Sequence, residues 1–477
     1  MIGGISRMKG AEPVAAQTND FSKGSISRNI LTLAVPMTAA QLVNVLYSVV
    51  DRIYLGMLPG SLELTGVGVT LPVISIIMGF ANLCGTGGAP LCSMHRGRGD
   101  QEEAERVMGN SLSLLLLFGV AVTALFLLVK EPMLYLFGAS SATYPYADAY
   151  MTIYLLGTVF VMIGLGMNPF INTQGFGKVG MMTVCLGAVA NIILDPIFIF
   201  AFGMGVEGAA LATVLSQGLS AAWVLKFLTG PKAILRLRPS CLRLRADRVR
   251  KIVSLGLSGF FMNLTNSLVQ MLCNATLQNY GGDLYVGMMT IINSLREVVT
   301  MPIMGMNNAS QPIISYNYGA GKYARVCAGI RFNFAVSVAC AALFWAAAML
   351  FPGPLIQIFN RNPQIVEAGI PALRIYFCLF IPMSLQMAGQ SVFVSLGRSK
   401  QAIFFSLLRK AVINASLTVI LPLWMGTTGV FTAEAVSQLV GGLACSLTMY
   451  VTVYRPFHGL PDQPTGQPPP GAPLSKD

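Results

Sequence analysis

The sequence has few charged side chains. Asp, Glu, Lys and Arg make up 10% of its 477 residues, whereas soluble domains carry roughly a quarter. Hydrophobic residues make up 54% of the chain, and its mean hydropathy is +0.65. Apolar runs long enough to cross a bilayer recur from one end to the other, which excludes a soluble domain with a single anchor. Because a bilayer offers the backbone no hydrogen bonds, these runs predict an all-α integral membrane protein.

Residues that support enzyme or nucleotide chemistry are also scarce. The two histidines, His95 and His458, have no acid–Ser or acid–Cys arrangement around them, so a hydrolytic or transfer activity is not expected. The sequence has no GxxxxGK[ST] loop for nucleotide phosphates, which argues against ATP coupling. The nine cysteines are an odd number without CxxC or Cys/His spacing, so structural disulfides and a zinc site are not expected. No cofactor is predicted.

The apolar runs predict twelve transmembrane helices. Their expected ranges are 30–55, 65–94, 108–129, 149–170, 181–201, 205–228, 252–279, 285–316, 330–350, 370–395, 402–424 and 429–453. Basic residues gather in every second connection, whereas the other connections hold few, chiefly Lys130 and Arg361. The positive-inside rule therefore places both termini in the cytoplasm. This topology accounts for the net charge of +12 without nucleic acid, since the basic residues are not interleaved with aromatic ones.

A basic stretch divides the twelve spans into two sets of six. It runs from Lys226 to Lys251 and has nine basic residues against one acid, Asp247. The predicted domains are a cytoplasmic N-terminal tail (1–28), an N-lobe six-helix bundle (29–228), a basic cytoplasmic linker (229–250), a C-lobe six-helix bundle (251–455) and a disordered Pro-rich cytoplasmic tail (456–477).

The two sets of spans are related by an internal repeat. An offset of 221 places GVEGAALATVLSQ (205–217) on GTTGVFTAEAVSQ (426–438), with both glycines and the final Ser-Gln matched. An offset of 222 places RNILTLAVP (28–36) on RKIVSLGLS (250–258). Matches in order at nearly one offset indicate a duplicated unit. Because six is even, both halves cross the membrane in the same sense, which predicts two pseudo-symmetric bundles in a parallel repeat, an architecture typical of transporters.

Several motifs together resemble the multidrug and toxic compound extrusion (MATE) family. They are VVDRIYLG in the first span, HRGRGDQEEAERV, NPFINTQGFGK, NIILDPIFIF followed by GMGVEGAALAT, and QPIISYNYGAGKY. The resemblance extends over nearly all of residues 28–455, in the family's order, and is greatest to the prokaryotic branch that keeps its coupling acids in the N-lobe. It implies a monomeric secondary antiporter in the prokaryotic cytoplasmic membrane. Such a protein exports amphipathic, mostly cationic organic compounds in exchange for H⁺ or Na⁺ by alternating access.

Four acids lie inside predicted spans: Asp51, Asp195, Glu297 and Glu434. A carboxylate at mid-membrane costs about 2.5–3.5 kcal/mol on insertion scales, so each needs a partner, a proton or a wet cavity. For Asp51 the alternative is a fixed structural partner, and for Asp195 it is a solvated helix end. Arg52 lies roughly 100° around the helix from Asp51, so we expect it to reach the interface rather than pair with this acid.

Polar residues spaced by whole helical turns form a stripe on four predicted spans of the N-lobe. The pairs are Asn44 and Asp51, Tyr150 and Asn168, Asn191 and Asp195, and Thr213 and Gln217. The resemblance implies that these spans converge. It matches Asp51, Asn191, Asp195 and Thr213 to the family's N-lobe cation site, and Asn44, Tyr150 and Asn168 to the surrounding hydrogen-bond network. Gln217, on the same helix face as Thr213, is expected to belong to this network as well.

Two kinds of coupling ion fit such a site. Two carboxyl groups in a poorly hydrated cavity repel one another when both are ionised, so they can hold a proton. Two carboxylates with Asn and Thr oxygens also make an all-oxygen cage for a hard cation such as Na⁺. The sequence leaves both open.

The C-lobe acids Glu297 and Glu434 are secondary candidates for coupling, since some family members place their acids there. Alternatively, both acids are structural and are neutralised by Arg296, Arg409 and Lys410.

Two further positions bear on mechanism. Pro36 lies fifteen residues before Asp51 and permits a kink in the first span. The resemblance implies that this hinge bends with the acid's protonation, and the alternative is a static kink. Cys273 occupies the repeat position of Asp51, which argues against a duplicated ion site.

Two other functions are alternatives to antiport. A flippase for lipid-linked saccharide precursors would favour extra spans and a basic central cavity, and the sequence shows neither. A membrane-embedded lipid-modifying enzyme would need a catalytic dyad or a metal cluster near one interface.

Overall fold

A computed structural model describes residues 19–58 and 61–463, and every secondary-structure element within them is helical. The first half of the chain forms α1 (Ile26–Gly56), α2 (Ser61–Gly97), α3 (Gln101–Leu136), α4 (Tyr144–Leu156), α5 (Thr158–Asn172), α6 (Gly177–Pro196), η1 (Ile197–Ala201), α7 (Gly205–Thr229) and η2 (Pro239–Leu242). The second half forms α8 (Ala246–Gly319), α9 (Tyr323–Leu350), α10 (Pro352–Gln357), α11 (Pro363–Phe377), α12 (Phe380–Ser395), α13 (Ser399–Leu407), η3 (Leu408–Asn414), α14 (Ala415–Ile420), α15 (Pro422–Met425), α16 (Thr427–Met449), η4 (Tyr450–Tyr454) and α17 (Arg455–His458).

The helices account for the predicted twelve spans. In the described residues, nine helical stretches are long and apolar enough to cross a membrane, and two bent pairs add one span each. One of the nine, α8, has 74 residues and is broken at Gly282, where φ is 66° and ψ is −165°. Glycine adopts this backbone conformation without a steric penalty, so the chain reverses there between two spans.

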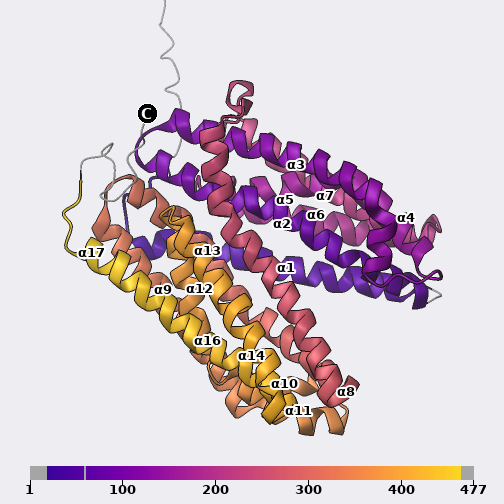
Figure 1. The fold of residues 1–477 in the computed structure, drawn as a ribbon. Helices are drawn as coiled ribbons and strands as arrows, with labels where there is room; N and C mark the ends of the chain where they lie inside the picture. The colour runs from indigo at the N-terminus through magenta and orange to yellow at the C-terminus, as the bar shows by residue number, and fades with distance from the viewer. Residues whose placement is uncertain (1–18, 59–60, 464–477) are drawn as a thin grey trace, which may run out of the picture.

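The two halves of the chain form separate bundles, the N-lobe with α1 to α7 and the C-lobe with α8 to α17. Figure 1 shows that the bundles meet near α17 and diverge toward the ends of α4 and α11. At the closed end, α2 and α8 touch backbone to backbone, because a Cβ at Gly256 would overlap the carbonyl of Leu83 and a Cβ at Gly319 would overlap that of Met94. Small residues allow such close helix packing in a membrane protein.

The segment before α1 ties the closed end together. Arg96 of α2 donates hydrogen bonds to the carbonyls of Asn19 (2.5 Å) and Thr173 (2.8 Å), so it holds this segment to the N-lobe. Arg325 of α9 donates to the carbonyl of Phe21 at 2.9 Å, which holds the same segment to the C-lobe. Residues 19–25 therefore bridge the two bundles at this end.

The bridging segment also has a charged anchor, Asp20, which lies outside the spans. Burial alone would raise the pKa of Asp20, but hydrogen bonds from Ser22 and Tyr316 outweigh burial and lower that pKa to about 2. Asp20 therefore stays ionised at neutral pH, and the Tyr316 hydroxyl donates to it at 3.1 Å.

Parts of the predicted tails and linker belong to helices or contact them within the described residues. Of the tail predicted over 1–28, residues 26–28 belong to α1, and residues 1–18 lie outside the described residues. Of the tail predicted to be disordered from residue 456, the first part continues α17, and Gln463 is hydrogen-bonded to Tyr323 at 3.3 Å. The linker predicted over 229–250 packs against α3, where Asn110 donates to the carbonyl of Cys241 at 3.2 Å.

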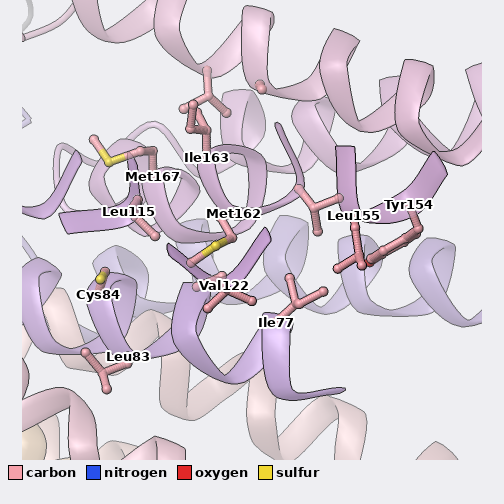
Figure 2. Packing of buried hydrophobic residues seen from close by; sticks show 14 of the residues in the cluster. Ile77, Leu83, Cys84, Leu115, Val122, Tyr154, Leu155, Met162, Ile163 and Met167 are labelled. Atoms are coloured by element: carbon pink, nitrogen blue, oxygen red, sulfur yellow. The ribbon is translucent and has the colours of Figure 1, made fainter. Parts of the chain in front are cut away.

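Close packing of apolar side chains stabilises each bundle. In the N-lobe, Ile77 of α2, Val122 of α3, Leu155 of α4 and Met162 of α5 are buried in one cluster, and Figure 2 shows them lying together. Lipid is as apolar as these side chains, so dispersion contacts rather than exclusion from water hold the helices together. This packing fixes the positions from which the polar residues project.

Candidate functional site

Two carboxyl groups meet inside the N-lobe. Asp51 projects from α1, and Asp195 projects from the last turn of α6, where it is fully buried. The two groups are within hydrogen-bonding reach of one another. Asp51 Oδ1 and Asp195 Oδ2 are buried and meet no hydrogen-bond donor in the described structure. Ionised carboxylates only accept hydrogen bonds, so a shared proton or a cation is needed to join this pair.

Hydrogen bonds extend from the acid pair into the bundle. Asn191 Nδ2 donates to Asp195 Oδ1 at 3.2 Å and to Thr213 Oγ1 at 3.4 Å. Tyr150 of α4 also contacts Thr213, within hydrogen-bonding reach. The structure thus brings together the four residues predicted for cation coupling and one residue predicted for the supporting network.

Tyr47 is a further member of this cluster, and it is not among the residues predicted from the sequence. Its hydroxyl is within hydrogen-bonding reach of Thr213, and its ring lies near both acids. Tyr47 precedes Asp51 by four residues, a spacing that places two helical side chains on the same face. The spacing was visible in the sequence, but a tyrosine in an apolar run is more often a packing residue.

A cavity of about 240 Å³ lies beside the cluster. It is bordered by α1, α2, α5, α6 and α7, and by α8 of the C-lobe. Nine amide side chains line it: Gln41, Asn44, Asn82, Asn168, Asn172, Asn191, Gln217, Asn308 and Gln311. Among the described residues that line it, none is Asp, Glu, Lys or Arg. Asn191 is both a lining residue and a hydrogen-bond donor to Asp195, so it connects the cavity to the acid pair.

This cavity, rather than the acid pair, is where three of the predicted network residues lie: Asn44, Asn168 and Gln217. The prediction that Tyr150 and Asn168 share one straight stripe is wrong, because their span bends by 56° between α4 and α5, at Gly157. Asn168 donates instead to the carbonyl of Gly180 at 3.3 Å. Because of the bend, Tyr150 lies beside the acid pair, whereas Asn168 lies at the cavity.

Pro36 lies inside α1, at its junction with α6. A Cβ at Gly177 would lie 3.2 Å from Pro36 Cγ, so the proline ring packs against the start of α6. Whether α1 bends here during a transport cycle stays a prediction.

The two C-lobe candidates have different surroundings. Glu434 of α16 is buried and accepts hydrogen bonds from Lys410 Nζ at 2.9 and 3.0 Å, so these two residues form an ion pair. Asn414 and Gln438 also donate to its carboxylate. Glu297 of α8 is exposed and has no ion pair within the described part of the chain. The geometry favours the structural alternative for Glu434.

This geometry defines a class of protein: a two-bundle, multi-pass membrane transporter with buried polar sites inside its lobes. A family model described as MatE matches residues 36–197 and 259–420, once in each half of the chain. The chain belongs to the MATE family and is a transporter rather than an enzyme.

Curated relatives extend over most of the chain. The sequence is 25% identical over 431 residues to the multidrug export protein MepA of Staphylococcus saprophyticus, covering 90% of this chain and 95% of the relative. It is 24% identical over 434 residues to MepA of Staphylococcus aureus strain NCTC 8325, covering 90% of this chain and 95% of the relative.

Solved structures show the same fold. A MATE transporter in complex with MaD3S superposes with a TM-score of 0.87 at 23% identity, covering 93% of this chain and 99% of that one. An outward-facing multidrug resistance MATE transporter superposes with a TM-score of 0.86 at 22% identity, again covering 93% and 99%. The predicted all-α fold of two pseudo-symmetric bundles is confirmed.

Proposed function

We propose that this protein is a secondary active multidrug efflux antiporter that exports amphipathic, mostly cationic organic compounds in exchange for H⁺ or Na⁺. The observation that supports it most is the buried pair Asp51 and Asp195, joined through Asn191 to a cavity wide enough for small organic groups. The relatives named for multidrug export support the direction and breadth of transport.

Coupling follows from the charge of this pair. When neither a proton nor Na⁺ is bound, the two carboxylates repel one another in a poorly solvated bundle. Binding of the ion relieves this repulsion and draws α1 toward α6. Because Asn191 borders both the acids and the cavity, the rearrangement changes the cavity where the exported compound binds, so the two ligands favour different states of one lobe.

The conformation fits one state of an alternating-access cycle. The lobes are closed at the end that carries residues 19–25 and α17, and they diverge at the other end (Figure 1). The positive-inside rule assigns the closed end to the cytoplasm, together with both termini. The described state is then outward-open, in the cytoplasmic membrane of a prokaryote, and a single chain contains both lobes that the cycle needs.

The cavity argues against the flippase alternative. A carrier of lipid-linked diphosphates needs basic side chains facing its central cavity, because phosphate oxygens are strong anionic acceptors. The described lining residues of this cavity are uncharged amides, hydroxyls and apolar groups. Amides offer both donors and acceptors, which suits varied organic compounds.

The test measures efflux of a fluorescent organic cation from cells that express the native protein or Asp51→Asn at equal membrane levels. We expect gradient-driven efflux from the native protein and a loss of at least tenfold in Asp51→Asn, because one carboxylate can no longer take part in ion exchange. Separate collapse of the H⁺ and Na⁺ gradients identifies the coupling ion.

Asp283→Asn is the matched control, since it removes an exposed carboxylate in the turn beside Gly282. It should export dye as the native protein does. Equal efflux from native protein and Asp51→Asn would refute coupling through this acid. Efflux that persists after both gradients are collapsed would refute antiport itself.

A further inference from the structure

The charges inside the C-lobe do not balance. Among the buried side chains described for α8 to α17, Glu434 is the acid, whereas Arg409 and Lys410 are basic. Arg248, at the start of α8, is also buried, but it is neutralised by an ion pair with Glu103 of α3 at 2.6 Å. Arg296 of α8 also faces Glu434 and lies against the Tyr376 hydroxyl. Three basic groups, Arg296, Arg409 and Lys410, therefore surround one carboxylate.

The carboxylate of Glu434 already accepts as many hydrogen bonds as it has acceptor sites. Glu434 accepts two hydrogen bonds from Lys410, one from Asn414 and one from Gln438 at 3.4 Å. A carboxylate has about four acceptor sites, so these donors leave none for another group. Lys410 neutralises the negative charge, and Arg409 gains no direct partner from it.

Arg409 has no hydrogen-bond partner among the residues that the structure describes. Its side chain lies between Glu434, Gly441 and Cys445, and only 8% of its surface is exposed. Nε and Nη1 of its guanidinium are buried and meet no acceptor in the described structure. A guanidinium stays charged in proteins, so it cannot relieve this cost by losing a proton. Buried charges are otherwise paired or solvated.

The local backbone is also unusual. Arg409 and Lys410 lie on η3, a π-helical segment of seven residues from Leu408 to Asn414. A π-helical turn rotates the side chains that follow it relative to an α-helix, and such turns occur frequently at functional sites. This backbone turns two consecutive basic residues toward the interior of one bundle.

We propose that the C-lobe binds a small monovalent anion at Arg409, with Arg296 contributing to the positive field. The guanidinium of Arg409 would bind a group that has one negative charge and lone pairs to accept hydrogen bonds. Chloride and the carboxylate group of an organic compound both have these properties. This site goes beyond the proposed antiport function, because it lies in the other lobe and takes a ligand of opposite charge. An anion there would balance one of the two excess positive charges of the cluster.

Binding to the purified full-length protein tests the site without any ion gradient. The probes are ³⁶Cl⁻ and ¹⁴C-benzoate, each in Hepes neutralised with N-methylglucamine. We expect saturable binding of at least one probe to the native protein and a reduction of at least tenfold in Arg409→Met. Binding of ³⁶Cl⁻ that benzoate does not displace identifies the inorganic source, and binding of benzoate identifies the carboxylate source.

Arg374→Met is the matched control, because it removes an exposed arginine from α11 of the same lobe and should bind the probe within twofold of the native protein. Arg409→Lys keeps the charge and should bind more weakly than the native protein but better than Arg409→Met. If Arg409→Met does not fold, binding to Arg409→Lys provides the test of the anion site. The proposal is overturned if neither probe binds the native protein saturably, or if the folded Arg409 variants bind as it does.

Discussion

The two lobes contain the same hydrogen-bond pattern with different charges. In the N-lobe, an asparagine of α6 donates to an aspartate one turn on and to a threonine of α7. In the C-lobe, an asparagine of η3 is bonded to a threonine one turn on and to a glutamate of α16. The repeat pairs Asn191 with Asn414, Asp195 with Thr418 and Thr213 with Glu434, at offsets of 221 to 223. One duplicated arrangement therefore supports two different sites.

The difference lies in what neutralises each site. Lys410 provides a built-in ammonium for Glu434 at 2.9 Å, and the residue at its repeat position is Gly187, which lines the N-lobe cavity. The N-lobe pair of Asp51 and Asp195 has no such cation among the described buried residues. We infer that the N-lobe site must take its positive charge from a transported ion, whereas the C-lobe site has its own.

The strongest way to break this contrast is Glu434→Gln. The substitution removes the carboxylate that three basic groups surround, so buried cations are left uncompensated. Loss of one partner from a buried pair costs about 3–5 kcal/mol, and we expect a folding loss of this size. Thermal unfolding of the detergent-purified variant measures it, and the double variant Glu434→Gln with Lys410→Met should recover part of the loss. A Glu434→Gln protein as stable as the native one but unable to export dye would instead make Glu434 a coupling acid.

Asp195→Asn tests the other side of the contrast. The substitution removes one of the two facing carboxyl groups. The new amide can donate a hydrogen bond to the carboxylate of Asp51. We expect thermal stability equal to or above that of the native protein, together with a loss of at least tenfold in dye efflux. If the variant unfolds as easily as Glu434→Gln, both lobes hold structural acids and the contrast fails.

The sequence predicted the spans well because membrane crossing depends on long apolar runs, which local composition records. It also predicted the break between the ranges 252–279 and 285–316, where Gly282 reverses the chain. The 56° bend at Gly157 was missed, because a continuous apolar run looks the same whether it is straight or bent. Because of this bend, Tyr150 and Asn168 do not lie on one face of a straight helix, as their spacing had predicted. Contacts between distant segments, such as Gln463 with Tyr323, likewise leave no local signal.

The candidate site shows the same division between local and long-range information. The spacing of Asn191 and Asp195 was enough to place them on one face, and they are hydrogen-bonded. The charge balance of the C-lobe could not be predicted from the spacing of residues along one helix. It depends on which of the nearby bases reaches Glu434, and only the packing of η3 against α16 assigns Lys410 to that role.

A smaller effect is expected from Tyr47→Phe. The substitution removes a hydroxyl within reach of Thr213 and keeps the ring beside the acid pair. One hydrogen bond contributes about 0.5–1.5 kcal/mol, so the concentration of the coupling ion needed for half-maximal efflux should rise about two- to tenfold. Dye efflux measured across a series of H⁺ or Na⁺ concentrations gives this value. Tyr150→Phe, on α4, should act similarly, and an unchanged ion dependence in both variants would remove Thr213 from the ion site.

The smallest effect is expected from Glu297→Gln. Glu297 is an acid inside a span, as Asp51 is, but its side chain is exposed and forms no ion pair in the described residues. Within the described residues, its carboxyl group forms no hydrogen bond to a second acid or to an amide of the cavity. We therefore expect efflux within twofold of the native protein in the same dye assay, with stability unchanged. A tenfold loss would mean that the C-lobe contributes a coupling acid from its surface, and the assignment of ion exchange to the N-lobe alone would then be wrong.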